Sequence, residues 1–246
     1  MSAVLTFKLV LEYPGGGFRG WAAQPGLRTV EGSLSDALAT VLRERPDLSV
    51  AGRTDTGVHA RGQVVSFVSD ATEPAALARS LNGVLPRDVA VVAGTTARDG
   101  FDARRAARSR TYSYRLLARA TPSPFELDRS LWWPHPLDEA ALRECAAALP
   151  GTHDFTAFTP TQSEHVRFER DVRRAEWRRS DDVLEFWIEA DTFMRHMVRV
   201  LVGTMLEVGA GRRDAAGFAA LLAGAPRSSA GPTAEAHGLC LESVSY

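Results

Sequence analysis

Hydrophobic residues in the first half of the chain recur at two spacings, one typical of strands and one typical of helices. Apolar side chains at every second position predict a strand over 7–11. A stripe at three- and four-residue spacing predicts a helix from Thr29 to about Arg45, which Pro46 would end. The same patterns predict a second helix at 74–84, with proline in its first turn. They also predict three further strands, at 63–68, 89–92 and 110–117.

The second half repeats this order of strands and helices. Two alternating runs flank Asp181-Asp182, which predicts a hairpin of strands 172–178 and 183–190. Helices are expected at 138–149, 193–209 and 214–222, the last capped by Asp214, and a small-residue loop at 224–232 leads to a closing strand at 239–246. The predicted fold is α+β, with two similar halves, residues 1–106 and 107–246, that suggest duplication of one unit.

Residues 51–63 hold one carboxylate, two guanidiniums, an imidazole and three glycines directly before a predicted strand. Asp55 is the only acid between Asp47 and Asp70, and basic residues flank it. A nearby opposite charge lowers the pKa of an Asp by about 1–3 units, so Asp55 is expected to be ionised, as a nucleophile or general base requires. Asp followed two residues later by Gly is also common in turns, where the carboxylate bonds to its own backbone. Spacing alone leaves both interpretations open.

This loop, with Gly-Arg-Thr-Asp at 52–55 and Gly-Val-His-Ala at 57–60, resembles the signature of the tRNA pseudouridine synthase A family. Further matching segments follow in chain order at 12–21, 28–34, 81–89, 101–104, 112–114, 151–155, 193–199 and 238–246. Three positions depart from the family pattern. Thr56 replaces a usual Ala, Ala22 replaces the first Gln of Trp-Gln-x-Gln, and Ala236-His237 replaces a Pro-Glu or Ala-Glu pair.

The resemblance implies the pseudouridine synthase fold, in which two α+β halves join their antiparallel sheets around a central active-site cleft. It also implies isomerisation of uridine to pseudouridine in the anticodon stem–loop of tRNAs, at positions 38, 39 and 40. The glycosidic bond breaks, the base turns, and C5 joins the ribose. Because no atom leaves and no redox change occurs, we expect no cofactor and no metal. The residues do not decide whether the Asp attacks ribose C1′, attacks base C6 or removes a sugar proton.

The resemblance assigns roles to five residues. Asp55 is the catalytic residue and Arg199 its ion-pair partner, which would join the two halves. Arg199 lies among apolar residues of its predicted helix, where an unpaired charge is costly, although it could snorkel to solvent. Arg53, Tyr112 and Leu239 would bind substrate, with the tyrosine stacked on the target uracil. Without the resemblance, the alternatives are a surface arginine, a half-buried strand tyrosine, which is the commoner case, and a core leucine.

Charge distribution adds a candidate RNA surface. Residues 98–119 contain seven arginines against two acids, although the whole chain has a net charge of −1. We expect Arg104, Arg108 and Arg110 to contact tRNA phosphates, with a solvated charged face as the alternative. A second arginine cluster at 167–179 is a weaker candidate, and His59 and Arg61 are expected as loop or RNA contacts.

The overall composition narrows the cellular location and the classes of function that the protein can have. The chain has 246 residues, 45% hydrophobic and 24% charged, with no apolar run near the ~18 residues of a membrane span, no basic leader and two cysteines. We therefore expect a cytoplasmic protein without membrane association, and the family implies a homodimer. Two other classes stay open: a non-catalytic RNA-binding module, and a glycosidase-like hydrolase, which would usually need a second carboxylate near Asp55.

Overall fold

The computed structural model describes residues 4–70, 73–162 and 166–246 and divides the chain into two compact units. Unit 1 comprises the residues up to Arg108 together with Leu241–Tyr246, and unit 2 comprises Ser109–Cys240. Both units combine strands with helices, which confirms the predicted α+β class. The last six residues, Leu241–Tyr246, belong to unit 1 by their contacts. The expected domains, 1–106 and 107–246, stay a prediction, as do the joined sheets and the central cleft.

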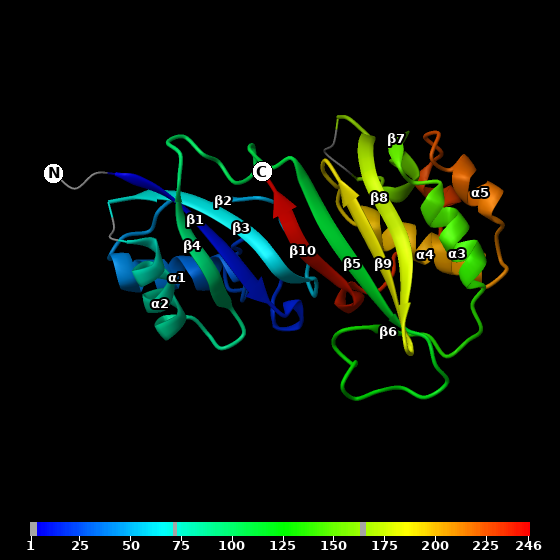
Figure 1. Cartoon of the computed structure of the whole chain (residues 1–246), viewed down its shortest axis with the longest axis horizontal. Helices are drawn as coiled ribbons and strands as arrows, with labels where there is room; N and C mark the ends of the chain where they lie inside the picture. The colour runs from blue at the N-terminus through cyan, green and yellow to red at the C-terminus, as the bar shows by residue number, and fades with distance from the viewer. Residues whose placement is uncertain (1–3, 71–72, 163–165) are drawn as a thin grey trace. The chain divides into compact units, whose positions relative to one another are not determined.

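Unit 1 is built on an antiparallel sheet with two helices packed side by side (Figure 1). Its strands are β1 (Leu5–Tyr13), β2 (Ser49–Val50), β3 (His59–Ser69), β4 (Ala90–Ala97) and, from Leu241 onward, β10 (Leu239–Ser245). β1 lies between β4 and β3, β2 pairs with β3, and β10 follows β3. The helices are α1 (Val30–Leu42), α2 (Pro74–Val84) and the 3-10 helix η1 (Gly15–Gly17). Phe7, Leu9 and Leu11 of β1 are buried, as their alternation predicts.

The ends of several unit 1 elements differ from the sequence prediction: β1 is longer at both ends, and β4 continues to Ala97. β3 begins four residues early, because its first residues continue the pairing with β1 as far as the Tyr13–Ala60 pair. His59 and Arg61 are thus strand residues, and their expected place in the loop is wrong. α1 stops at Leu42, since Arg43 takes up a left-handed backbone conformation, with φ at 61°.

Unit 2 pairs an antiparallel sheet with three packed helices (Figure 1). Its strands are β5 (Ser109–Leu117), β6 (Leu131–Trp132), β7 (Gly151–Asp154), β8 (Glu169–Ser180) and β9 (Val183–Ala190). The order is β5, β9, β8, β7, and β6 runs parallel to β5. The helices are α3 (Glu139–Ala147), α4 (Met197–Gly209), α5 (Ala215–Ala220) and the 3-10 helices η2 (Thr156–Phe158), η3 (Arg227–Ser229) and η4 (Ala236–Gly238). Trp177 of β8 contacts Met205 of α4 through its indole N–H, which ties sheet to helices.

Local signals in unit 2 are confirmed at the hairpin and at α5. β8 and β9 turn at Asp181-Asp182, and Asp214 caps α5 by accepting the N–H of Gly217 at 2.6 Å. The predicted start of α4 at Phe193 is wrong, because the helix begins at Met197. His196 has a φ of 61°, which breaks the helical backbone just before it.

Candidate active site

Asp55 lies on the loop between β2 and β3, and the residues just before it are held by buried polar side chains. Thr54 Oγ1 lies 2.8 Å from the hydroxyl oxygen of Tyr13. Gln63 donates from Nε2 to the carbonyl oxygen of Gly52 at 2.7 Å and to the Tyr13 hydroxyl at 3.3 Å. Gln63, Tyr13 and Thr54 are 0%, 3% and 6% exposed. The loop is therefore fixed from the protein interior.

The glycine-rich turn after β1 supports the same loop. The N–H of Trp21 donates to the carbonyl oxygen of Thr54 at 3.0 Å. Gly20 has a φ of 85°, and a Cβ there would lie 3.0 Å from the same oxygen. A Cβ at Gly15 would lie 2.1 Å from the carbonyl oxygen of Val58. Glycine at these two positions lets the turn approach the loop closely.

The loop itself turns at Asp55. The N–H of Val58 donates to the Asp55 carbonyl oxygen at 3.1 Å, and Gly57 has a φ of 82°. The Asp55 side chain is half-buried, whereas Arg53 and Thr56 on either side are exposed. The carboxylate thus lies at the surface of a rigid loop, as both a catalytic group and a turn residue would.

His59, at the start of β3, faces the glycine-rich turn. Its Nδ1 lies 3.0 Å from the N–H of Gly15, which donates to it. A ring nitrogen that accepts carries no proton, so this contact selects the neutral tautomer with its hydrogen on Nε2.

Three other residues were predicted to bind the target uracil or to pair with Asp55, and all three belong to unit 2. Tyr112 of β5 is buried and packs edge-to-face on Phe193, with ring centroids 5.1 Å apart. Arg199 lies in the first turn of α4, half-buried, and donates from Nε to the carbonyl oxygen of Ala234 at 2.7 Å. Leu239 is buried at the start of β10. The predicted Asp55–Arg199 ion pair would join unit 1 to unit 2, and it stays a prediction.

Residues 231–234 lie along α4, and Ala234 holds Arg199 in place. The N–H of Ala234 donates to the Arg199 carbonyl oxygen at 3.1 Å, which makes the contact between these two residues reciprocal. Gly203 allows the close approach, because a Cβ there would lie 1.9 Å from the carbonyl oxygen of Pro232. Thr204 Oγ1 accepts the N–H of Gly231 at 3.0 Å.

Tyr114 is a residue near Arg199 that the sequence reasoning did not single out. It is fully buried, and its hydroxyl donates to the carbonyl oxygen of Glu235 at 2.9 Å. Burial raises the pKa of the phenol above its ordinary value, while the charge of Arg199 partly opposes that rise. The alternating Tyr112 and Tyr114 in one strand already indicated that both side chains share a face.

The predicted arginine patch divides into exposed and buried members. Arg104 and Arg108 are exposed, but Arg110 is only 8% exposed and donates from Nη1 to the carbonyl oxygen of Asp191 at 2.7 Å. Asp102 accepts the N–H of Arg104 at 2.9 Å, which fixes the backbone below that side chain. Arg104 and Arg108 are accordingly the members placed to meet solvent.

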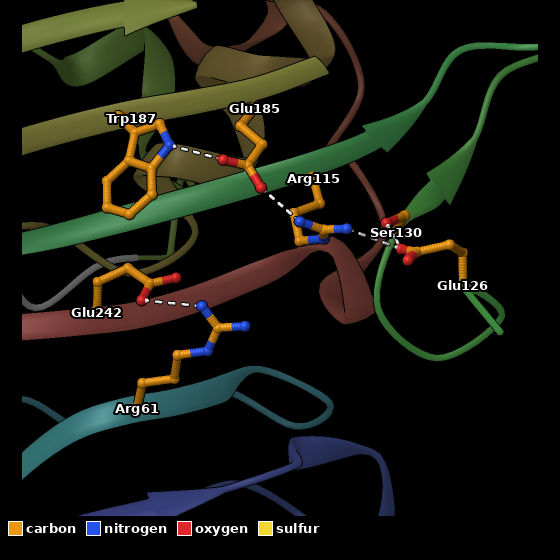
Figure 2. Close-up of polar contacts among 7 residues, drawn as sticks. All are labelled: Arg61, Arg115, Glu126, Ser130, Glu185, Trp187 and Glu242. Carbon is orange, nitrogen blue, oxygen red and sulfur yellow. Dashed lines mark hydrogen bonds and ion pairs between the residues drawn. The ribbon is translucent and has the colours of Figure 1, made fainter. Parts of the chain in front are cut away.

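Two other arginines of interest are already paired with acids (Figure 2). In unit 1, Arg61 lies 3.6 Å from Glu242. In unit 2, Arg115 contacts both Glu126, at 3.1 Å, and Glu185. Glu126 and Glu185 therefore offset one of the positive charges that the sequence alone assigns to residues 98–119.

Within residues 4–70, 73–162 and 166–246, no three or more His, Cys, Asp or Glu side chains are grouped to hold a metal ion. Across the same ranges, no helix has the length and apolar character needed to cross a bilayer.

Comparison with known proteins identifies similar sequences over nearly the whole chain. A family model described as tRNA pseudouridine synthase matches residues 145–246. A protein named tRNA pseudouridine synthase A from Myxococcus xanthus is 44% identical, over 97% of this chain and 91% of the relative. Relatives with the same name from Chromobacterium violaceum and Moorella thermoacetica are 42% and 40% identical, over 97% of this chain and 92% and 98% of their own lengths. The matched region includes both units and the Asp55 loop.

Proposed function

The chain belongs to the tRNA pseudouridine synthase A family, and from this premise we propose that it isomerises uridine to pseudouridine in the anticodon stem–loop of tRNAs, with Asp55 as the catalytic residue. Positions 38, 39 and 40 are the proposed targets. The observation that carries the assignment to Asp55 is its setting: a half-buried carboxylate on a loop whose preceding residues are fixed by buried hydrogen bonds. A loop held by a rigid scaffold is a common place for catalytic groups.

The reaction requires a uridine to leave its base stack, which costs a few kcal/mol. A carboxylate held beside the flipped nucleotide can then attack C1′, attack C6 or remove a sugar proton. Each route uses ionised Asp55, and in each the atoms of the uridine are all kept. A rigid loop favours such a step because the reacting group is already oriented when the substrate binds.

Three other residues are proposed to act on the flipped nucleotide or on Asp55. Arg199 pairs with the Asp55 carboxylate, with its Nε and carbonyl oxygen already used by Ala234. Tyr112 stacks on the uracil, and Leu239 forms an apolar wall beside it. Base–aromatic contacts contribute about 1–3 kcal/mol each.

The exposed arginines supply the proposed contacts to tRNA outside the active site. Arg53 flanks Asp55, and Arg104 and Arg108 lie farther along unit 1. Arg110 instead acts through the backbone it holds at Asp191. A cytoplasmic homodimer is proposed as the working form, because the family resemblance implies that one tRNA spans two subunits. Light scattering of the purified protein measures this directly, and a monomeric mass at working concentration contradicts it.

Pseudouridine mapping on unmodified tRNA transcripts tests the function, using wild type, Asp55→Asn and Asp47→Asn. Asp47 is exposed, so its substitution is a matched control for the loss of one carboxylate. We expect new pseudouridines in the anticodon arm with wild type and Asp47→Asn, and tRNA binding without product with Asp55→Asn. If the wild type binds tRNA tightly but forms no pseudouridine, the protein is a non-catalytic RNA-binding module. Release of free uracil would indicate a hydrolase.

A further inference from the structure

We propose that Tyr13, Thr54 and Gln63 are positioning residues for the Asp55 loop, so that their hydrogen bonds set the rate of the chemical step more than the affinity for tRNA. This inference rests on the proposed function of Asp55. None of the three is proposed to touch the substrate. They belong to β1, the loop and β3, and they meet below the loop.

The contacts reach the loop at two points on the same side of Asp55. Gln63 holds the carbonyl oxygen of Gly52, and Tyr13 holds the Thr54 hydroxyl one residue before the carboxylate. The other face of Gln63 is also fixed, since its Oε1 accepts the N–H of Val64 at 3.2 Å. With both amide atoms engaged, the Gln63 side chain cannot turn without breaking a bond at the loop.

The backbone of Thr54 is held as well as its side chain. Its carbonyl oxygen accepts the N–H of Trp21 at 3.0 Å, while its Oγ1 meets Tyr13 at 2.8 Å. Thr54 is therefore clamped between β1 and the glycine-rich turn. Asp55 is the next residue and is half-buried, so this clamp lies directly beside the residue that carries the carboxylate.

A buried polar cluster is a costly way to gain stability alone. Replacing both partners of a buried hydrogen bond with apolar groups of the same shape can be nearly neutral, and Phe, Val and Leu would fill a similar volume here. What an apolar cluster lacks is direction, because dispersion contacts tolerate small displacements that a hydrogen bond resists. Directional hydrogen bonds in this cluster would therefore hold Asp55 in a defined position.

The expected effect is on kcat. A displacement of about 1 Å in a catalytic group can slow a reaction about 100-fold. We therefore expect Thr54→Val, which removes the hydroxyl and keeps the shape, to lower the single-turnover rate constant roughly 10- to 100-fold. The Kd for tRNA should stay within about twofold, since the phosphate contacts lie on exposed arginines.

The experiment measures single-turnover pseudouridine formation with enzyme in excess, tRNA affinity, and thermal unfolding. Thr54→Ser keeps the hydroxyl and should recover most of the rate. Tyr13→Phe also removes the acceptor of Gln63 Nε2, so it should slow the step at least as much as Thr54→Val. The double variant should be little slower than Tyr13→Phe alone, because the bond that Thr54→Val removes is already lost in Tyr13→Phe. Thr159→Val is the control, since Thr159 is buried in unit 2 and its hydroxyl donates to the Phe155 carbonyl oxygen at 3.0 Å.

The outcomes separate the two proposals. If Thr54→Val and Tyr13→Phe form product at the wild-type rate while Asp55→Asn forms none, the positioning role is wrong and the proposed function stands. If Thr159→Val slows the reaction as much as Thr54→Val at equal loss of thermal stability, the effect is general destabilisation. If wild type forms no pseudouridine, both proposals fail. Should Thr54→Val not fold, Tyr13→Phe and Thr54→Ser still decide the question.

Discussion

Gly203 is the position where a single added methyl group should disturb the proposed active site most. A Cβ there would lie 1.9 Å from the carbonyl oxygen of Pro232, well inside the 3.0 Å that real Cβ atoms respect. In Gly203→Ala, α4 and residues 231–234 must therefore separate by about 1 Å. The reciprocal bonds between Arg199 and Ala234 lie one turn away and join the same two segments.

The cost follows from three contributions. Overpacking typically costs about 1–3 kcal/mol. Each of the two hydrogen bonds between Arg199 and Ala234 contributes about 0.5–1.5 kcal/mol if it is lost. Replacing Gly by Ala inside a helix returns up to about 1 kcal/mol. We expect Gly203→Ala to lower the free energy of unfolding by roughly 1–5 kcal/mol, together with a lower rate of pseudouridine formation.

Urea denaturation of Gly203→Ala and Gly83→Ala tests this reasoning. Gly83 lies in α2 with no atom within 4 Å of its added Cβ, so it isolates the helix preference for Ala. Gly83→Ala should leave stability unchanged or raise it by up to about 1 kcal/mol. Equal midpoints for the two variants would show that residues 231–234 move away from α4 without measurable cost. A normal rate in Gly203→Ala would show that the placement of Arg199 does not depend on them.

Three further predictions concern charge and pH. The hydrogen bond from Arg28 holds the pKa of the Asp88 carboxyl below its usual value, so Asp88→Asn should cost no more than about 1 kcal/mol at neutral pH, and urea titrations should show that difference vanish as pH falls through the lowered pKa. Burial raises the pKa of Tyr114, so the unfolded chain alone ionises this phenol near pH 10; stability should fall as pH rises past about 10, and less so in Tyr114→Phe. Arg104→Ala should reduce the slope of log K for tRNA against log salt by about 1 in filter binding, whereas Arg110→Ala should chiefly lower the melting temperature.

Elements that depend on local chemistry were predictable from the sequence. α2 has the predicted bounds because Pro74 suits a first turn and Glu73 caps the next N–H groups. Short strands were missed because their residues carry no pattern of their own. β2 and β6 have two residues each, and they exist because β3 and β5 lie beside them. The predicted start of α4 was wrong because a tertiary contact is again involved: Phe193 lies before the helix and packs on Tyr112.

In the candidate active site too, local sequence predicts some features, and tertiary contacts determine the others. A dense run of glycine and charge identifies the Asp55 loop, since such residues are adjacent in sequence. What holds that loop is not adjacent: Tyr13 lies 41 residues from Thr54 and 50 from Gln63, and each is an ordinary strand residue in its own segment. A period-two pattern indicates which face a side chain occupies but not which polar atom it will meet across strands. Arg110 shows the same limit, because a charge in an arginine cluster suggests exposure to solvent, whereas the residue is buried and donates to the carbonyl oxygen of Asp191. Chemistry carried by neighbours in sequence can thus be inferred before the fold is known, whereas the hydrogen bonds that orient it belong to the tertiary structure.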